Sequence, residues 1–299
     1  MTPIRLGKTT IERISEVDAM WFDPEWLCPD IDDEVLRRHA DWLGMPFFDA
    51  GARKIALSFH SYLIRTPGRN ILVDTCNGNH KPRGPRVAWQ NQLASDQYLT
   101  NLARAGLRPE DIDIVMCTHL HTDHVGWNTV LKDGRWVPTF PNARYLMARD
   151  EFDHFAALHA AAPAYPVNHG AWIDSVLPVV DAGLADIVDM RHVVEAGLDD
   201  GIWMEPAPGH TPGHVTIHVK GGGADAIMSG DIIHHPILVA EPDLTMFADY
   251  DPARGRQARR SLLERCADTS TLLLTAHFPA PTAGRICSCG ESFRFRFSE

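Results

Sequence analysis

Four side chains that can bind metal ions lie within six residues of one another, directly after a short apolar segment. The segment 112–116 is predicted to be a buried strand, and it is followed by Thr118-His119-Leu120-His121-Thr122-Asp123-His124. In an extended chain, residues i and i+2 point to the same side, so we expect His119 and His121 to face one point. Asp123 and His124 come where the chain turns and can face a second point. Imidazole and carboxylate groups bind zinc, iron, manganese and cobalt, so this segment predicts a metal site.

Three later segments also bring candidate ligands to the end of a strand or into a tight turn. The candidates are His210 or His214 in a Gly-His-Thr-Pro-Gly-His turn, Asp231 after an apolar strand, and His277 after another. Each segment alone is a weak signal. Together with the 119–124 segment they supply enough ligands for two metal ions.

The hydrophobic pattern predicts more strands than helices. We expect strands at 54–64, 70–74, 112–116, 143–148, 193–194, 202–204, 215–219, 226–228, 271–275 and 293–297, and helices at 32–43, 95–105, 150–160 and 255–266. Two sheets flanked by helices would accommodate this order. No linker or low-complexity segment interrupts the chain, so we expect residues 1–299 to form a single domain.

Residues 10–52 are rich in aromatic side chains and, apart from the predicted helix, are expected to be irregular. We expect this segment to be an N-terminal extension near the pocket. It would serve as a cap on an apolar pocket, as part of the core or as a contact in a homodimer, and for each single side chain a place in the core or in a dimer contact is favoured over the cap. The arginines that crowd the 255–266 helix are interpreted as a solvated face; they are Arg254, Arg256, Arg259 and Arg260.

The composition excludes several classes of partner. The net charge of −11 argues against a nucleic-acid partner, which usually requires a basic face. No apolar segment is long enough to cross a bilayer and no secretory signal is apparent, so we expect a cytoplasmic protein without a membrane partner. The six cysteines are expected to be free thiols.

The order His-x-His-x-Asp-His, Gly-His-Thr-Pro-Gly-His, Gly-Asp and a late histidine resembles the metallo-β-lactamase superfamily, over about residues 54–290. The resemblance implies the α+β fold of that family, an αββα sandwich of two mixed sheets flanked by helices. It also implies two divalent metal ions, with zinc as the default and iron, manganese or cobalt as alternatives. One ion would be held by His119, His121 and His210, the other by Asp123, His124 and His277, and Asp231 would bridge both. His214 would then be structural.

Two segments narrow the resemblance to one branch of the superfamily. Residues 230–234 and 276–279 look most like acyl-homoserine lactonases and methyl parathion hydrolase. The best-known lactamases carry Cys where Asp231 stands, and flavodiiron proteins carry Glu at the position of His121, so antibiotic hydrolysis and redox chemistry are disfavoured. The best-known lactonases have a Tyr shortly after the bridging Asp, whereas this chain has none between Asp231 and Asp249.

The resemblance implies a hydrolase in which a hydroxide that bridges the two ions attacks the carbonyl carbon of a lactone or carboxylic ester. Asp123 or Asp231 would pass a proton to the leaving group, and the sequence does not choose between them. His234 would line the pocket of this small-molecule substrate, or else be a loop histidine. Phosphotriester hydrolysis is the alternative reaction, and a non-catalytic metal-binding protein is the alternative of another class.

Overall fold

The computed structural model describes residues 2–84, 95–196 and 201–298. The chain divides into two compact units, each built from segments that are distant in the sequence. Unit 1 comprises Met1–Thr2, Val17–Ser58 and Val193–Glu299, and unit 2 comprises Pro3–Glu16 and Phe59–His192. The expectation that residues 1–299 form a single domain stays a prediction.

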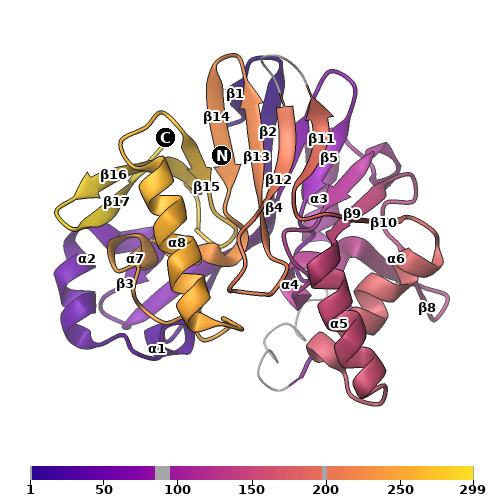
Figure 1. Ribbon diagram of the computed structural model, residues 1–299, viewed down its shortest axis with the longest axis horizontal. Coiled ribbons are helices and arrows are strands. Elements are labelled where there is room, and N and C mark those ends of the chain that lie inside the picture. Colours follow the sequence, from indigo (N-terminus) through magenta and orange to yellow (C-terminus); the bar gives the residue numbers. More distant parts are fainter. Residues whose placement is uncertain (1, 85–94, 197–200, 299) are drawn as a thin grey trace. The chain divides into compact units, whose positions relative to one another are not determined.

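Unit 2 is built on a mixed sheet with the strand order β1-β2-β4-β5-β6-β9-β10 (Figure 1). The strands are β1 (Ile4–Leu6), β2 (Thr9–Phe22), β4 (Lys54–Arg65), β5 (Asn70–Val73), β6 (Ile114–Met116), β9 (Arg144–Ala148) and β10 (Ala185–Val188). β2 and β4 continue into unit 1, where β3 (Phe48–Asp49) pairs with the start of β4. β5, β6, β9 and β10 are parallel neighbours. Their carboxyl ends therefore lie at one edge of the sheet, where α/β proteins place their ligands.

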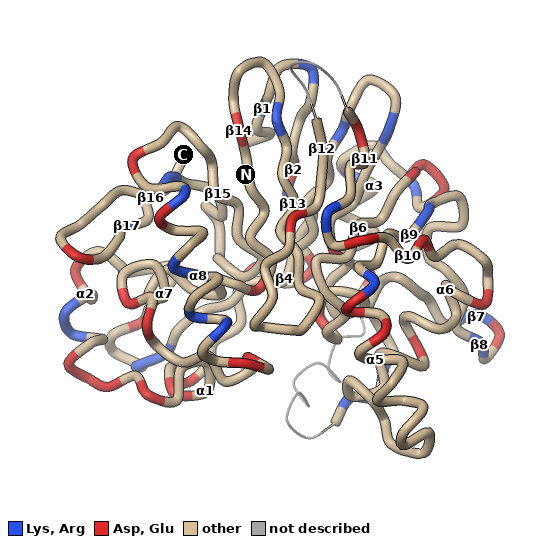
Figure 2. The backbone as a smooth tube through the Cα atoms, in the orientation of Figure 1, with Lys and Arg blue, Asp and Glu red and all other residues tan. Residues whose placement is uncertain are grey.

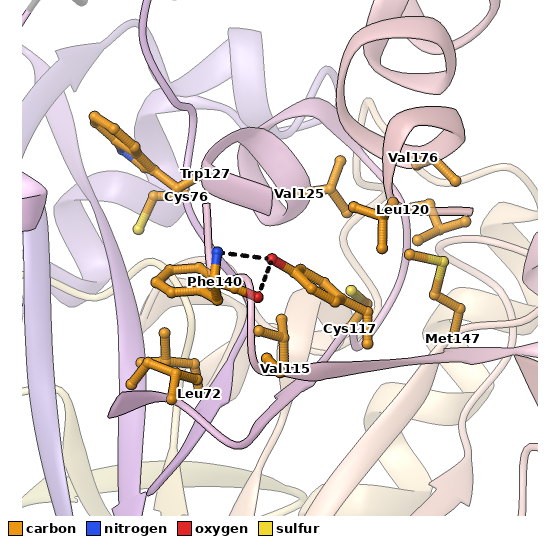
Figure 3. Close-up of a cluster of buried hydrophobic side chains, with 14 of the residues drawn as sticks. Leu72, Cys76, Val115, Cys117, Leu120, Val125, Trp127, Phe140, Met147 and Val176 are labelled. Carbon is orange, nitrogen blue, oxygen red and sulfur yellow. Dashed lines mark hydrogen bonds between the residues drawn. The ribbon is translucent and has the colours of Figure 1, made fainter. Parts of the chain in front are cut away.

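Helices and a hairpin complete unit 2. They are α3 (Gln97–Arg104), α4 (Thr122–Val125), α5 (Arg149–Ala161), α6 (Leu177–Asp181) and the hairpin of β7 (Thr129–Lys132) and β8 (Arg135–Pro138). α5 packs against β9 and β10. Leu120 and Val125 are buried in the same hydrophobic cluster as Val115, Cys117 and Met147 (Figure 3). The 119–124 segment is therefore anchored in the core of the unit at both ends.

Unit 1 contains a second mixed sheet, with the strand order β11-β12-β13-β14-β15-β16-β17. The strands are β11 (His192–Ala196), β12 (Gly201–Pro206), β13 (Val215–Gly221), β14 (Ala224–Met228), β15 (Leu272–Leu274), β16 (Ala283–Cys289) and β17 (Ser292–Phe297). The helices are α1 (Pro24–Leu27), α2 (Asp33–Phe47), α7 (Ile237–Ala240) and α8 (Pro252–Cys266). α8 packs against β16 and α7 against β17. Two mixed sheets with helices on them confirm the predicted fold class.

The expectation of irregular structure at the start of the 10–52 segment is wrong. Residues 9–22 form the 14-residue strand β2. Charged residues obscure its apolar alternation, yet two of them have specific partners. Glu12 pairs with Arg65 of β4 at 2.9 Å, and Glu16 is buried within unit 2. The strand is thus stabilised by partners far along the chain, which no local pattern can reveal.

Three of the six aromatic side chains of the 10–52 segment are buried, namely Phe22, Phe47 and Phe48, whereas Trp21 is exposed. Phe47 is 4% exposed; it stacks on Phe297 with ring centroids 4.5 Å apart and meets the edge of Phe278 at 6.2 Å. Phe22 stacks on Trp26 at 4.5 Å. A position of the segment near the substrate pocket stays a prediction.

Five arginines lie on α8, which carries the densest group of basic residues in Figure 2. The interpretation of Arg254, Arg256, Arg259 and Arg260 as a solvated face is wrong for Arg259, which is completely buried. The six cysteines are free thiols, as predicted. No helix in the described part of the chain is both long enough and apolar enough to span a membrane.

Candidate metal centre

The first group of candidate ligands, His119, His121, Asp123 and His124, lies in unit 2 and is called the 119–124 cluster here. It follows β6, and its last two members lie on α4. Leu120 points into the core, and its backbone N–H donates to the buried Glu151 carboxylate at 3.0 Å. With Leu120 fixed, the rings of His119 and His121 come to lie on the same side, their centroids 4.6 Å apart. The alternation predicted from the sequence is thus present.

Asp74 supports this cluster and was not predicted from the sequence. It directly follows β5 in a left-handed conformation (φ 57°). Its carboxylate accepts from the Thr118 amide and the Thr118 hydroxyl, both at 2.8 Å, and lies 2.9 Å from His124 Nδ1. An acceptor at Nδ1 keeps the ring proton there and presents Nε2 as the ligand atom. An acidic residue at the end of a parallel neighbour of β6 was the one signal available in the sequence.

The second group, His210, Asp231, His234 and His277, lies in unit 1 and is called the 210–277 cluster. All four side chains are buried. Asp231 is at its centre: its carboxylate oxygens lie 3.4 Å from His210 Nε2, 2.9 Å from His234 Nε2 and 3.0 Å from His277 Nε2. Three imidazole nitrogens therefore converge on one carboxylate.

The opposite ring nitrogens of two of these histidines face oxygen acceptors. His210 Nδ1 lies 3.1 Å from Asp249 Oδ1, and His277 Nδ1 lies 3.0 Å from the Ser58 carbonyl. Asp249 was not predicted from the sequence. It lies 39 residues from His210 in the chain, and only the packing of unit 1 brings its carboxylate to the His210 ring. Burial raises the pKa of Asp249 to about 6, although the Arg259 guanidinium opposes this rise.

This arrangement fits a metal ion. Because an acceptor faces Nδ1 of His210 and of His277, the proton of each neutral ring lies on Nδ1, and each Nε2 lone pair points toward Asp231. A lone pair directed at a carboxylate oxygen is repulsive unless both rings are charged or a cation is shared between them. Histidine ligands whose other nitrogen donates to an oxygen are typical of protein metal sites. The chemistry of the donors therefore fits a divalent cation.

His214 belongs to the support of the 210–277 cluster. It is completely buried, and its Nε2 accepts from the Asp231 amide at 3.0 Å. Its ring thus holds the backbone of Asp231 in place, in keeping with the structural role that the resemblance implied. His235 is likewise buried, and burial lowers its pKa to about 4, so its ring is neutral. Its Nε2 lies 3.0 Å from the Phe47 carbonyl.

A pocket of about 390 Å³ lies in unit 1 and is lined by residues of β12, β13 and α8. Its walls include Pro206, Pro208, Thr216 and Arg254, together with Ile232. Ile232 directly follows Asp231, but no predicted ligand lines the pocket. The pocket is therefore separate from the 210–277 cluster itself.

Residues 60–277 match the sequence family described as the metallo-beta-lactamase superfamily, which is more than half of the chain. The chain therefore belongs to the metallo-β-lactamase superfamily, as the order of its ligands predicted. The protein is thus a metal-dependent hydrolase of this superfamily.

Two relatives and one solved structure illustrate the match. A probable metallo-hydrolase of Mycobacterium tuberculosis is 25% identical over 248 residues, which cover 75% of this chain and 76% of that protein. An N-acyl homoserine lactonase of Bacillus thuringiensis is 25% identical over 227 residues, which cover 72% and 79%. The structure of AidC, described as a dizinc quorum-quenching lactonase, aligns over 100% of this chain and 97% of that one, with a TM-score of 0.77 and 20% identity. This last likeness shows the fold.

Proposed function

We propose that this protein is a dinuclear metal-dependent hydrolase that opens lactones and cleaves related carboxylic esters. The observation that carries the proposal is the convergence of three buried imidazole nitrogens on the Asp231 carboxylate. The 119–124 cluster supplies ligands of the same kind from unit 2. The names of the relatives support a small lactone as the substrate class, because they include N-acyl homoserine lactonases.

In this proposal, the seven ligands divide as the family resemblance implies. His119, His121 and His210 would hold one ion, Asp123, His124 and His277 would hold the other, and Asp231 would serve both. Zinc is the first candidate, and iron, manganese and cobalt suit the same nitrogen and oxygen donors. When bound, the ions supply Lewis acidity and lower the pKa of water in the site.

The chain's own residues orient the substrate and move protons. Asp123 and Asp231 are the carboxylates from which a proton can be passed to the leaving alkoxide. His234 has its ring 5.2 Å from that of His210 and 4.8 Å from that of His277, so it is held among the ligands. We assign it to contact with the bound substrate.

A substrate screen of the metal-loaded protein tests the proposal. We expect turnover of several acyl-homoserine lactones and aryl esters, with affinity rising as the acyl chain lengthens, because each buried methylene contributes about 0.8 kcal/mol. A phosphotriester and a β-lactam serve as comparison substrates. If the phosphotriester exceeded every lactone and ester in kcat/KM by orders of magnitude, the protein would be an organophosphate hydrolase. Metal binding without turnover of any of these compounds would indicate the non-catalytic alternative.

A further inference from the structure

Arg259 of α8 is completely buried, which is rare for a charged side chain. Its Nε donates to the Ile232 carbonyl at 3.0 Å, and its Nη1 donates to the carbonyls of Pro242 and Leu244 at 2.9 and 2.8 Å. Its Nη2 lies 3.7 Å from Asp249 Oδ2. Burying a guanidinium is unfavourable unless it is bonded and paired in this way. The side chain therefore joins several backbone carbonyls to one buried carboxylate.

Asp249 connects this guanidinium to a candidate metal ligand. The Asp249 side chain is only 1% exposed, and its Oδ1 lies 3.1 Å from His210 Nδ1. It has little room to move, because a Cβ atom at Gly255 would lie 2.5 Å from Asp249 Oδ2. The carboxylate is thus confined between Arg259, His210 and the first turn of α8.

The backbone holds the His210 loop against the same segment. Tyr250 N donates to the His210 carbonyl at 3.0 Å, and Asp251 N donates to the Gly209 carbonyl at 2.9 Å. Gly209 has a φ of 145°, and a Cβ atom there would lie 2.3 Å from Gly255 N. Such close approach requires glycine at position 209. The segment directly before α8 therefore fixes both the ring and the backbone of His210.

Arg259 also contacts the backbone next to Asp231, the central residue of the 210–277 cluster. Ile232, whose carbonyl Arg259 holds, directly follows Asp231 in the chain. The Asp231 amide is fixed by His214 at 3.0 Å. The backbone of Asp231 is thus held on one side by an imidazole and on the other by the guanidinium that pairs with Asp249.

We propose that Arg259 and Asp249 are positioning residues that set the metal affinity of the 210–277 cluster. Asp249 keeps the proton on His210 Nδ1, so that Nε2 is presented as a ligand. Arg259 fixes Asp249 and, through Ile232, the backbone next to Asp231. The inference rests on the proposed metal-dependent function, but it assigns two residues that are not themselves ligands.

The test compares D249N and R259K with the control R260A in the full-length protein. Asn preserves the shape of Asp249 but removes its charge, and Lys lacks the planar fork that reaches several carbonyls. Loss of an outer partner of a metal-bound histidine typically weakens metal binding 10–100-fold, so we expect zinc affinity to fall by about that factor in both variants. Arg260 lies on the same helix, but it is partly exposed and pairs with Asp243 at 2.7 Å. R260A should bind zinc as tightly as the wild type.

Two readouts separate positioning from simple support of the fold. Zinc affinity is measured by competition with a chelator, and the visible absorption of the cobalt-substituted protein reports the geometry at the metal. Thermal unfolding of the metal-free variants measures the loss of stability independently. A wild-type protein that bound no zinc and no cobalt would overturn the proposed function. If the wild type bound metal and D249N retained both its zinc affinity and its cobalt spectrum, while only its melting temperature fell, the positioning role would be overturned and the proposed function would stand.

Discussion

The 119–124 cluster and the 210–277 cluster carry the same kinds of ligand but are built in different ways. All four side chains of the first come from the loop that follows β6 and from the short helix α4. The second draws His210, Asp231 and His277 from three separate loops, each of which requires its own support from Asp249, His214 or Ser58. Local backbone geometry is therefore sufficient to align most of the first cluster, whereas the second depends on packing between distant segments.

The largest effect is expected at Asp231, on which the 210–277 cluster converges. Asp231→Asn removes the negative charge that three imidazole nitrogens face, so the histidines lose their common partner. Loss of a partner outside the ligand set already costs 10–100-fold, so we expect this change to lower kcat/KM by more than about 100-fold and to reduce the metal content. Steady-state kinetics and elemental analysis measure the two quantities. Full activity with an unchanged metal content would refute the central place of Asp231.

The next prediction tests whether the 119–124 cluster binds metal without support from residues outside it. Asp74→Ala removes the acceptor of His124 Nδ1 and of both Thr118 groups. We expect metal affinity to fall by about 10–100-fold, because the ring of His124 loses its fixed orientation. Asp111→Ala is a suitable control, since the Asp111 carboxylate bonds only with Arg108, through its guanidinium at 3.0 Å and its backbone N–H at 2.8 Å, and contacts no candidate ligand among the described residues. Unchanged affinity in the Asp74 variant would show that the 119–124 segment needs no support from β5, which would sharpen the contrast between the clusters.

The last prediction concerns the stability of unit 2 rather than its ligands, and it leaves the contrast between the two clusters untouched. Burial raises the pKa of Glu16 from 4.5 to about 7, although hydrogen bonds from Asn77, Trp127 and Gly78 oppose this rise. Between these two values the unfolded chain gives up the proton and the folded chain keeps it. The contribution to the free energy of unfolding is therefore fully present below pH 4.5 and is lost as the pH rises to about 7, by about 3 kcal/mol.

Glu16→Gln should remove this dependence. Urea unfolding of the wild type and the variant at several pH values between 4.5 and 8 gives the difference in free energy of unfolding, in which the other titrating groups cancel. We expect that difference to shift in favour of the variant as the pH rises. Parallel pH profiles for the two proteins would contradict the raised pKa of Glu16.

The sequence by itself determined the parts of this protein that depend on neighbouring residues. The alternation of His119, Leu120 and His121 predicted which side chains face the core and which converge, because an extended backbone has a period of two. The hydrophobic patterns likewise predicted α2, α3, α5, α8 and most of the strands. They missed β1, β2, β3, β10, β16, the hairpin of β7 and β8, and the short helices α1, α4, α6 and α7. The order of the ligands was specific enough to predict the family.

The tertiary structure alone decided the features that join distant segments. β2 lacks a clear alternation because its charged residues find their partners elsewhere in the sheet, as Glu12 does with Arg65. Arg259 looks like a surface residue of α8, and its burial follows only from the carbonyls and the carboxylate that other loops bring to it. Asp74 and Asp249 contact histidines that lie 50 and 39 residues away. The physical reason is that hydrogen bonding and charge pairing depend on distance in space, which strand order and loop packing set and which local sequence patterns do not encode.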